Sequence, residues 1–426
     1  MAEPIASAEP APSTDYNAAG AVSTLRKPDP NVRIAVTGAG IICSIGRNKD
    51  EVWSAIAESR AGIRKLTRFP GETFPTDLAA EVDEDLDAMV PLDRRDAKRM
   101  SRSDKLAVIA AAEAIAQAGV ALERAIVSTG TSTGGLVEGE DYYFKRLLRG
   151  RRRAPASLVL QQPTSGPSDA VARTFNLGGG VVSNATACAS AGAAIGMAAD
   201  YLRARHADAA IAGGTDALCR LTYSGFNVLQ AVDGEACAPF SSRRKGITLG
   251  EGAAYLVLER WEDAAARGAQ VIAELCGYGA TCDAHHPTAP HEEGRGAEAA
   301  MRGALCDARS TAEAIDYINA HGTGTLLNDS SETKAIIAAV GTGVPVSSSK
   351  SYFGHTLGAS GAVEAVITVL ALANQIAPPT LRLESAAADC PLDYIPHTPR
   401  PMRMQQALSN TFGFGGSNVS LLFKRA

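Results

Sequence analysis

Cys188 stands in a stretch made almost wholly of small residues, NATACASAGAAIG, at positions 184–196. An extended apolar run precedes the thiol and an alanine-rich run follows it, so the pattern predicts a buried strand, then Cys188, then a helix. A thiol at a helix N-terminus faces the positive end of the helix dipole, which favours the thiolate. Small neighbours would let a substrate carbonyl approach closely. Taken alone, the residue also fits a buried structural cysteine, which behaves as a small hydrophobe.

The second half of the chain supplies the groups that a nucleophile would need. His321 follows an apolar run in the glycine-rich turn AHGTGT, and Lys350 and His355 lie five residues apart in KSYFGH. The later turn NTFGFGGSN contains Phe414 and could offer backbone N–H groups to a developing oxyanion. One histidine is usually structural. Two histidines in glycine turns, together with a cysteine and a lysine in turns, indicate a catalytic site.

Short apolar runs alternate with helical patterns from Arg33 to the C-terminus, which predicts an α/β protein with mainly buried sheets. The alternation restarts after Val271, so we expect two duplicated halves. The predicted organisation is a tail over 1–31, a first half over 32–270 that carries the cysteine, and a second half over 271–426. GAG at 38–40 lacks the third glycine and the acidic residue of a dinucleotide fingerprint, so we interpret it as a glycine turn between a strand and a helix.

Composition excludes several classes of protein. The 426 residues are 46% hydrophobic and carry a formal net charge of -5, which does not favour nucleic-acid binding by the whole surface. Eight scattered cysteines form no CxxC pair, which indicates a reduced, cytoplasmic protein. The first thirty residues lack the basic and apolar regions of a signal peptide and predict a disordered tail. The apolar run at 365–373 is too short to span a bilayer.

Five motifs in order carry a resemblance to a known family: VTGAG, TACASA, AHGTGT, SKSYFGH and FGFGGSN. From about residue 32 to the C-terminus the chain closely resembles the β-ketoacyl-acyl-carrier-protein synthases of the thiolase superfamily. The resemblance implies a five-layered αβαβα fold with mixed buried sheets. It implies an acyltransferase that condenses an enzyme-bound acyl chain with malonyl-acyl carrier protein, with loss of carbon dioxide, in fatty acid or polyketide/polyene biosynthesis. No cofactor is expected beyond the phosphopantetheine of the carrier.

The resemblance also assigns roles to residues. Cys188 would accept the acyl chain as a thioester, and His321 and His355 would both donate to the thioester oxygen of the malonyl unit. Lys350 would orient and tune the two rings. Asp329 and Glu332 would support this group, and Glu364 would support the turn. The backbone N–H groups of Cys188 and Phe414 would form the oxyanion hole, and Phe414 would also gate the acyl tunnel. Thr323 and Thr325 would bind the pantetheine arm, His286 and Thr288 would lie at its entrance, and Thr133 would contact the acyl chain.

Two further clusters invite other interpretations. A group of possible zinc ligands comprises Cys276, Cys282, His285, His286 and His291. Its spacing matches no structural zinc pattern, so we expect no metal. A basic group comprises Arg95, Lys98, Arg99, Arg102 and Lys105, which recur every three or four residues and predict one helical face. That face is either simply solvated or, as the resemblance implies, the docking surface for an acidic carrier protein. A second basic cluster spans 145–153.

Departures from the family pattern leave the acyl substrate open. Gly324 and Leu326 stand where the family usually has Ser and Pro, SYF before Gly354 is bulkier than usual, and Thr133 replaces an aliphatic residue or glycine. LQQPTSGPSDAV also differs from the usual segment at the subunit interface. We therefore hypothesise an acyl chain other than a plain saturated one.

The residues of the site also bear on the alternatives to an elongating synthase. A non-catalytic chain-length subunit would lack the nucleophile, an initiating synthase generally has Asn in place of one histidine, and a degradative thiolase would show a second cysteine near SNTFGFGGSN. A homodimer and a heterodimer with a homologous chain-length factor both remain open.

Overall fold

The computed structural model describes residues 27–70, 74–150 and 154–426, so almost all of the predicted tail, and residues 151–153 of the second basic cluster, lie outside it. One ten-stranded mixed sheet dominates the fold, in the order β10-β9-β13-β14-β8-β1-β7-β6-β4-β5. The first five of its strands along the chain are β1 (Ile34–Cys43), β4 (Ala125–Gly130), β5 (Val181–Asn184), β6 (Ala209–Asp216) and β7 (Gly252–Arg260). The last five are β8 (Ala273–Cys282), β9 (Tyr317–Asn319), β10 (Val346–Ser347), β13 (Gln406–Gly413) and β14 (Ser417–Arg425).

The helices and minor strands fill the connections. The helices of the first half are α1 (Lys49–Ala57), α2 (Leu86–Met89), α3 (Arg94–Ala97), α4 (Arg102–Ala118), α5 (Leu136–Arg149), α6 (Ser157–Leu160), α7 (Gly166–Thr174), α8 (Ser190–Arg203), α9 (Arg220–Val228) and α10 (Trp261–Ala266). Those of the second half are α11 (Arg295–Asp307), α12 (Leu326–Ala339), α13 (Lys350–Phe353) and α14 (Ser360–Asn374). Two small antiparallel pairs are β2 (Arg64–Lys65) with β3 (Leu78–Ala79), and β11 (Ile376–Ala377) with β12 (Arg400–Pro401).

The sheet is built twice from one plan. The first half has the order β5-β4-β6-β7-β1 and the second has β10-β9-β13-β14-β8. In each half the first three strands are parallel and the next two antiparallel. Within the sheet, a short antiparallel pairing of β1 with β8 joins the two halves. We propose the connection between α10 and β8, around residue 270, as the boundary between them.

Glycines on equivalent strands let an outer helix approach each half-sheet. A Cβ built on Gly38 or Gly40 of β1 would lie about 2 Å from backbone oxygens of α4, and the same holds for Gly279 of β8 against α11. No side chain fits there, so these positions require glycine. The predicted glycine turn at 38–40 is therefore wrong, because both glycines lie within β1 and serve helix packing.

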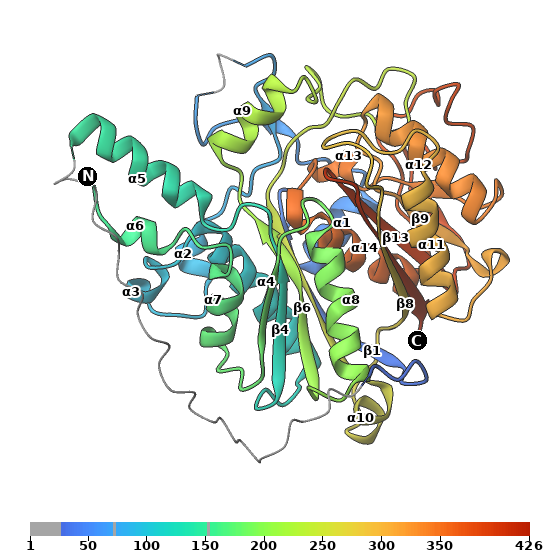
Figure 1. Ribbon diagram of the computed structural model, residues 1–426, viewed down its shortest axis with the longest axis horizontal. Helices are drawn as coiled ribbons and strands as arrows, with labels where there is room; N and C mark the ends of the chain where they lie inside the picture. Colours follow the sequence, from blue (N-terminus) through green and yellow to red (C-terminus); the bar gives the residue numbers. More distant parts are fainter. Residues whose placement is uncertain (1–26, 71–73, 151–153) are drawn as a thin grey trace, which may run out of the picture.

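Two central helices complete a five-layered αβαβα arrangement, which confirms the predicted fold class. Helices α8 and α14 pack against each other and contact both half-sheets, while α4 and α7 cover the outer face of the first half and α11, with α12 beside it, covers that of the second (Figure 1). The stretch Leu357–Asn374 is long and apolar enough to cross a membrane, but 83% of it is buried inside the protein. Its hydrophobicity belongs to the core.

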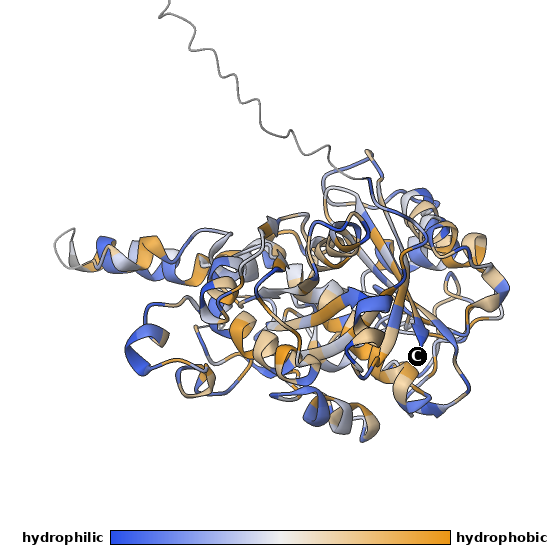
Figure 2. Ribbon diagram, turned by 90° about the horizontal axis from the view of Figure 1, so that it is seen from below, coloured by the Kyte–Doolittle hydropathy of each residue, from blue (hydrophilic) through white to orange (hydrophobic). Residues whose placement is uncertain are grey.

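Two features of the first half face outwards. Strand β5, predicted to be buried, is the edge strand of the sheet, and Val181 is 46% exposed because only β4 pairs with it. Helix α5 projects from the body with mixed hydrophobic and hydrophilic residues along it (Figure 2). Beside α5, the short helix α6 exposes Leu160. These edges leave apolar surface and backbone groups of the first half without cover.

Candidate active site

Loops that follow parallel strands of both halves meet at the site. The strands β4, β5 and β6 run parallel in the first half, and β9, β10 and β13 run parallel in the second. Cys188 follows β5, His321 follows β9, and Phe414 follows β13. Lys350 and His355 lie between β10 and α14. Within each half, the parallel strands bring their carboxyl ends to the same edge, which is where such proteins form their sites, and the loops of the two halves meet at Cys188, His321 and His355.

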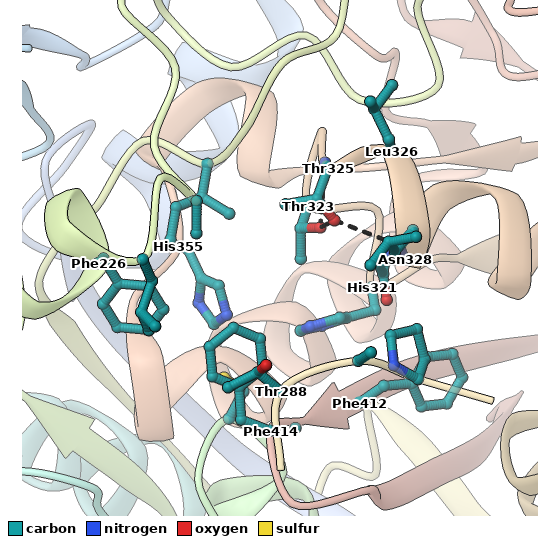
Figure 3. Close-up of a pocket in the computed structure, with 18 of the residues that line it drawn as sticks. Phe226, Thr288, His321, Thr323, Thr325, Leu326, Asn328, His355, Phe412 and Phe414 are labelled. Carbon is teal, nitrogen blue, oxygen red and sulfur yellow. Dashed lines mark hydrogen bonds between the residues drawn. The ribbon is translucent and has the colours of Figure 1, made fainter. Parts of the chain in front are cut away.

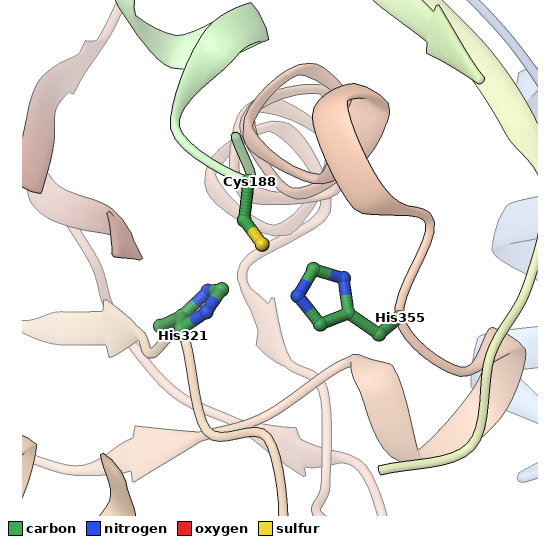
Figure 4. Close-up of side chains that lie close together, drawn as sticks. All are labelled: Cys188, His321 and His355. Atoms are coloured by element: carbon green, nitrogen blue, oxygen red, sulfur yellow. The ribbon is translucent and has the colours of Figure 1, made fainter. Parts of the chain in front are cut away.

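Cys188 lies on a tight turn that aims its sulfur between two imidazole rings (Figure 4). The preceding residue, Ala187, has a φ of 49°, a left-handed conformation that is rare for a residue with a side chain. The sulfur and one nitrogen each of His321 and His355 all lie within 4.8 Å of one another. The cysteine from the first half therefore meets both histidines from the second, as predicted.

Burial dominates the acidity of this thiol. Cys188 is 6% exposed, and burial raises its pKa to about 11. The positive charge of Lys350 and the backbone N–H groups of Phe414 and Cys188 act in the opposite direction, because they stabilise a negative sulfur. The predicted preference for thiolate is therefore wrong for the resting site. The backbone N–H groups of both residues nevertheless point at the sulfur, where the predicted oxyanion hole would lie.

Hydrogen bonds fix the tautomer of both histidines. The ammonium of Lys350 can only donate, and its Nζ lies 3.0 Å from Nδ1 of His321. The backbone N–H of Leu357 donates to Nδ1 of His355 at 3.1 Å, and the Ser360 hydroxyl lies 3.0 Å from the same atom. Since each Nδ1 accepts, each ring carries its proton on Nε2. Burial and then the charge of Lys350 hold both pKa values well below the usual range, so both rings are neutral donors.

A buried ion pair holds Lys350 in place. Its Nζ donates to the carbonyl oxygen of His321 at 2.7 Å and forms a short contact with the carboxylate of Glu364 on α14. Lys350 and Glu364 are both almost completely buried, so each charge depends on the other. Burial raises the pKa of Glu364 and the neighbouring Lys350 opposes that rise. The prediction gave Glu364 a role in the turn, whereas the structure places it directly on the lysine.

Two other buried carboxylates shape the His321 loop. Glu332 accepts from the backbone N–H groups of His321 and Gly322 at 2.8 and 2.7 Å. Asp329 accepts from the next two backbone N–H groups of the loop, at 3.0 and 3.1 Å. Both carboxylates come from the first turns of α12. They support the site, as predicted, through the backbone of the loop.

An apolar cavity of about 290 Å³ leads to these groups. Cys188 and both histidines line it together with the predicted Thr323, Thr325 and Thr288 (Figure 3). Phe414 also lines it, and its ring lies 5.6 Å from that of Phe226 on α9, centroid to centroid. Figure 3 shows Leu326 well away from the two imidazoles, and 60% of this side chain is exposed.

Comparison with known proteins decides the family. The model of the β-ketoacyl synthase N-terminal domain matches residues 31–264, and that of the β-ketoacyl synthase C-terminal domain matches residues 272–384. The chain belongs to the β-ketoacyl synthase family. The predicted condensing acyltransferase is thus confirmed.

Individual relatives agree with this assignment. The chain is 40% identical to 3-oxoacyl-[acyl-carrier-protein] synthase 2 of Synechocystis sp., over 92% of this chain and 98% of the relative. A solved ishigamide ketosynthase/chain length factor superposes with a TM-score of 0.88 at 34% identity, covering 93% of this chain and 99% of that one. The ketosynthase AntDE, solved with its type II acyl-carrier protein AntF, gives a TM-score of 0.85 at 28% identity over 94% and 100% of the two chains.

Two predicted substrate contacts of the synthase lie elsewhere. Thr133 is buried, its hydroxyl donates to Asp216, and it does not line the cavity. Its contact with the acyl chain stays a prediction. His286 is exposed, and its Nδ1 accepts from the backbone N–H of Thr288 and Ala289. It organises the 286–289 turn, while Thr288 itself reaches the cavity.

The predicted basic face is divided between two helices. Arg95, Lys98 and Arg99 are exposed on and just after α3, which ends at Ala97. A new helix, α4, begins at Arg102 because Ser101 and Asp104 form a capping box. Arg102 is only 13% exposed and pairs at 2.6 Å with a fully buried carboxylate, Glu251. Arg102 is therefore a structural residue, and the prediction that it belongs to the docking face is wrong.

Metal binding conflicts with the hydrogen bonds of the site. Among the described residues, the group of Cys188, His321 and His355 is the one whose possible ligand atoms converge. A metal would need the lone pair of each Nε2, but Nδ1 of each ring already accepts a hydrogen bond. Protonating His321 at Nδ1 instead would set two donors against each other, since Lys350 faces that atom.

Two residues of the site escaped the sequence interpretation. Phe226 stands in an ordinary amphipathic pattern, and nothing in the sequence separates it from a core residue. Asp216 had a signal, because AIAGGTD ends a buried strand in glycine and threonine, residues that also form the AHGTGT turn, and then places a charge there. A charge at the carboxyl end of a parallel strand is unusual in a core position and indicates a site.

Proposed function

We propose that this synthase uses Cys188, His321 and His355 to condense an acyl thioester with a malonyl thioester, giving a 3-oxoacyl thioester. One observation carries the proposal: a sulfur and two imidazoles that donate from Nε2 surround one point at the bottom of an apolar cavity. The hydrogen bonds of both rings support two neutral donors, and the neutral thiol supports a nucleophile that reacts only with substrate in place.

The first step transfers the acyl chain to the enzyme. The Cys188 sulfur attacks the acyl thioester carbonyl, and the negative oxygen is stabilised by the backbone N–H groups of Cys188 and Phe414. The carbon–sulfur bond to the pantetheine arm breaks, and the proton of the Cys188 thiol ends on the departing pantetheine thiol. Removing one such preorganised donor typically costs about 3 kcal/mol of barrier.

The second step forms the carbon–carbon bond. The malonyl thioester oxygen accepts from Nε2 of His321 and His355 as its carboxylate leaves as carbon dioxide, and the electron pair remains as an enolate. The enolate carbon attacks the acyl-Cys188 carbonyl, and the thiolate of Cys188 leaves and takes up a proton from solvent. Neutral imidazoles suit this step, because an imidazolium would protonate the carbanion more readily.

An acyl carrier protein delivers both substrates in this proposal. Thr323 and Thr325 line the cavity between its mouth and the imidazoles, where a pantetheine arm would pass. Exposed Arg95, Lys98 and Arg99 would bind the acidic carrier. The complex of AntDE with its acyl-carrier protein supports this partner. The steps balance without any cofactor other than the arm itself, and eight free cysteines agree with a cytoplasmic location.

A second chain would cover the open edge of the first half. The unpaired side of β5 and the leucines Leu148 of α5 and Leu160 of α6, each 81% exposed, are open surfaces of the first half. A second copy or a homologous chain-length factor fits there, and the ishigamide ketosynthase/chain length factor supports such a pair.

Intact mass spectrometry separates the two steps. With an acyl pantetheine thioester, we expect acyl-Cys188 to form in the native synthase and in His321→Ala and His355→Ala variants. With malonyl pantetheine added, the 3-oxoacyl product should form only in the native protein. Acylation at another residue, or product formation by both histidine variants, would overturn the proposal. Matched saturated and polyunsaturated acyl thioesters then test the substrate, since a clear preference for saturated chains would exclude the hypothesis of an unusual chain.

A further inference from the structure

One buried acid of the site region has no part in the steps above. Asp216 ends β6 and is completely buried. Among the described residues, no lysine or arginine lies within ion-pair distance of its carboxylate. Neutral donors satisfy it instead: the hydroxyls of Thr131 and Thr133 at 2.6 and 2.7 Å, and the backbone N–H groups of Ser132, Thr133 and Gly358 at 2.9, 2.8 and 2.6 Å.

These donors come from both halves of the protein. Residues 131–133 form the loop after β4 in the first half, whereas Gly358 belongs to the second half and follows His355 by three residues. A Cβ on Gly358 would lie 2.7 Å from the Asp216 carboxylate and 2.6 Å from the Ser132 nitrogen. The two halves therefore touch at this point with no room for a side chain.

The first branch of this network reaches the nucleophile. Ser132, whose N–H is held by Asp216, donates its hydroxyl to the carbonyl oxygen of Ala187 at 3.0 Å. Ala187 is the left-handed residue directly before Cys188. The carboxylate thus supports the strained turn from which the sulfur projects.

The second branch reaches one imidazole. The Gly358 N–H bound by Asp216 is adjacent to Leu357, which also has a left-handed φ of 52° and donates its own N–H to Nδ1 of His355. That hydrogen bond sets the tautomer of His355. Two hydrogen bonds therefore link the Asp216 carboxylate to the turn of Cys188, and two link it to the ring of His355.

We infer that Asp216 is a positioning residue that fixes the His355 turn of the second half against the Cys188 turn of the first. The inference rests on the proposed function, because that function requires the Cys188 sulfur and the His355 ring to lie at a fixed distance from each other. A carboxylate suits the position, since it accepts at both oxygens, whereas an amide would turn an N–H against one set of donors. Its charge has a separate effect, because it raises the pKa of the Cys188 thiol.

An Asp216→Asn variant separates positioning from general damage. We expect the decarboxylation of malonyl pantetheine to fall about 10- to 100-fold, since a displacement of about 1 Å costs that much. Alkylation of Cys188 by iodoacetamide at pH 8 should become faster, because loss of the negative charge lowers the thiol pKa. Thr133→Val, which removes one donor and keeps the carboxylate, should change both rates by less than about fivefold.

Gly358→Ala tests the same contact from the other half without changing any charge. It should slow decarboxylation, whereas the pH dependence of Cys188 alkylation should match that of the native protein. If Asp216→Asn fails to fold, Gly358→Ala alone tests the inference. Decarboxylation within twofold of native in both folded variants would overturn the inference, as would equal losses of decarboxylation and alkylation. Neither result touches the proposed function, which stands or falls with the Cys188 and histidine variants.

Discussion

The loop after β5 in the first half carries Cys188, and the equivalent loop of the second half, after β10, carries Lys350 and His355. Both lead into a central helix, α8 or α14, of the same layer. The first loop places its reactive group directly before the helix. The second inserts a short helix, α13, which buries the lysine. The two halves share one strand order, yet the first half carries the nucleophile and the second half carries the donors that stabilise negative charge.

The buried charges of the two halves differ in the same way. Asp216 in the first half is solvated by neutral donors, whereas Lys350 in the second half is paired with Glu364. The lysine charge sets the tautomer and lowers the pKa of His321, so it acts on the chemistry directly. The aspartate charge opposes ionisation of the thiol, so its benefit must come from geometry. A buried charge thus serves electrostatics in the second half and positioning in the first.

Removing the nucleophile should have the largest effect on condensation activity and tests the division of roles between the two halves. Cys188→Ala should lower condensation by about 10⁴-fold or more, because the acyl intermediate cannot form. Decarboxylation of malonyl pantetheine should continue, since both imidazole donors belong to the second half. Loss of both reactions in a folded protein would contradict the division between the halves. Cys282→Ala, an exposed cysteine outside the site chemistry, is the matched control.

Removing the lysine charge tests the second half. Lys350→Met combined with Glu364→Gln avoids an unpaired buried charge and should lower decarboxylation about 10²- to 10³-fold. Native activity should be flat between pH 6 and 8, because both histidine pKa values lie well below 6.5. In the double variant these pKa values rise, although burial still lowers them, so as the pH is lowered activity should begin to fall at a higher pH than in the native protein. An unchanged pH profile would show that Lys350 does not control the rings.

A smaller substitution sharpens the role of the tautomer. Ser360→Ala removes the hydroxyl 3.0 Å from Nδ1 of His355 and leaves the Leu357 N–H as the remaining donor. Loss of one hydrogen bond is worth about 1 kcal/mol, so decarboxylation should fall about fivefold while acyl loading of Cys188 stays native. Stopped-flow measurement of both steps gives the result. A larger effect on acyl loading than on decarboxylation would contradict the role of Ser360 in holding His355 for the second step.

Charge reversal at the surface should weaken carrier binding and leave the chemical steps unchanged. Arg95→Glu with Arg99→Glu should raise KM for carrier-bound substrate about three- to tenfold and leave kcat and iodoacetamide reactivity unchanged. Arg102→Glu serves as the contrast, because it breaks a buried ion pair and should lower Tm. An unchanged KM in the double reversal would remove this surface from carrier docking.

The site residues that follow strands could be predicted from their sequence motifs. Cys188, His321, Lys350 and His355 each lie in a turn of small residues, a pattern that packing alone does not require. Arg102 was assigned wrongly, and the bond of Thr133 to Asp216 was not foreseen, because each partner, Glu251 or Asp216, lies more than 80 residues away in the chain. The alternation of strands and helices predicted the layers, but the edge position of β5 depends on sheet order, which no local pattern encodes.

The protonation state of the two histidines tests the central claim most directly. Nitrogen-15 NMR of histidine-labelled protein, assigned with His321→Ala and His355→Ala, reports which ring nitrogen carries the proton. The site described above predicts two neutral imidazoles protonated at Nε2, unchanged from pH 8 down to about pH 5.5. An imidazolium at pH 7, or a proton on Nδ1 of either ring, would contradict it.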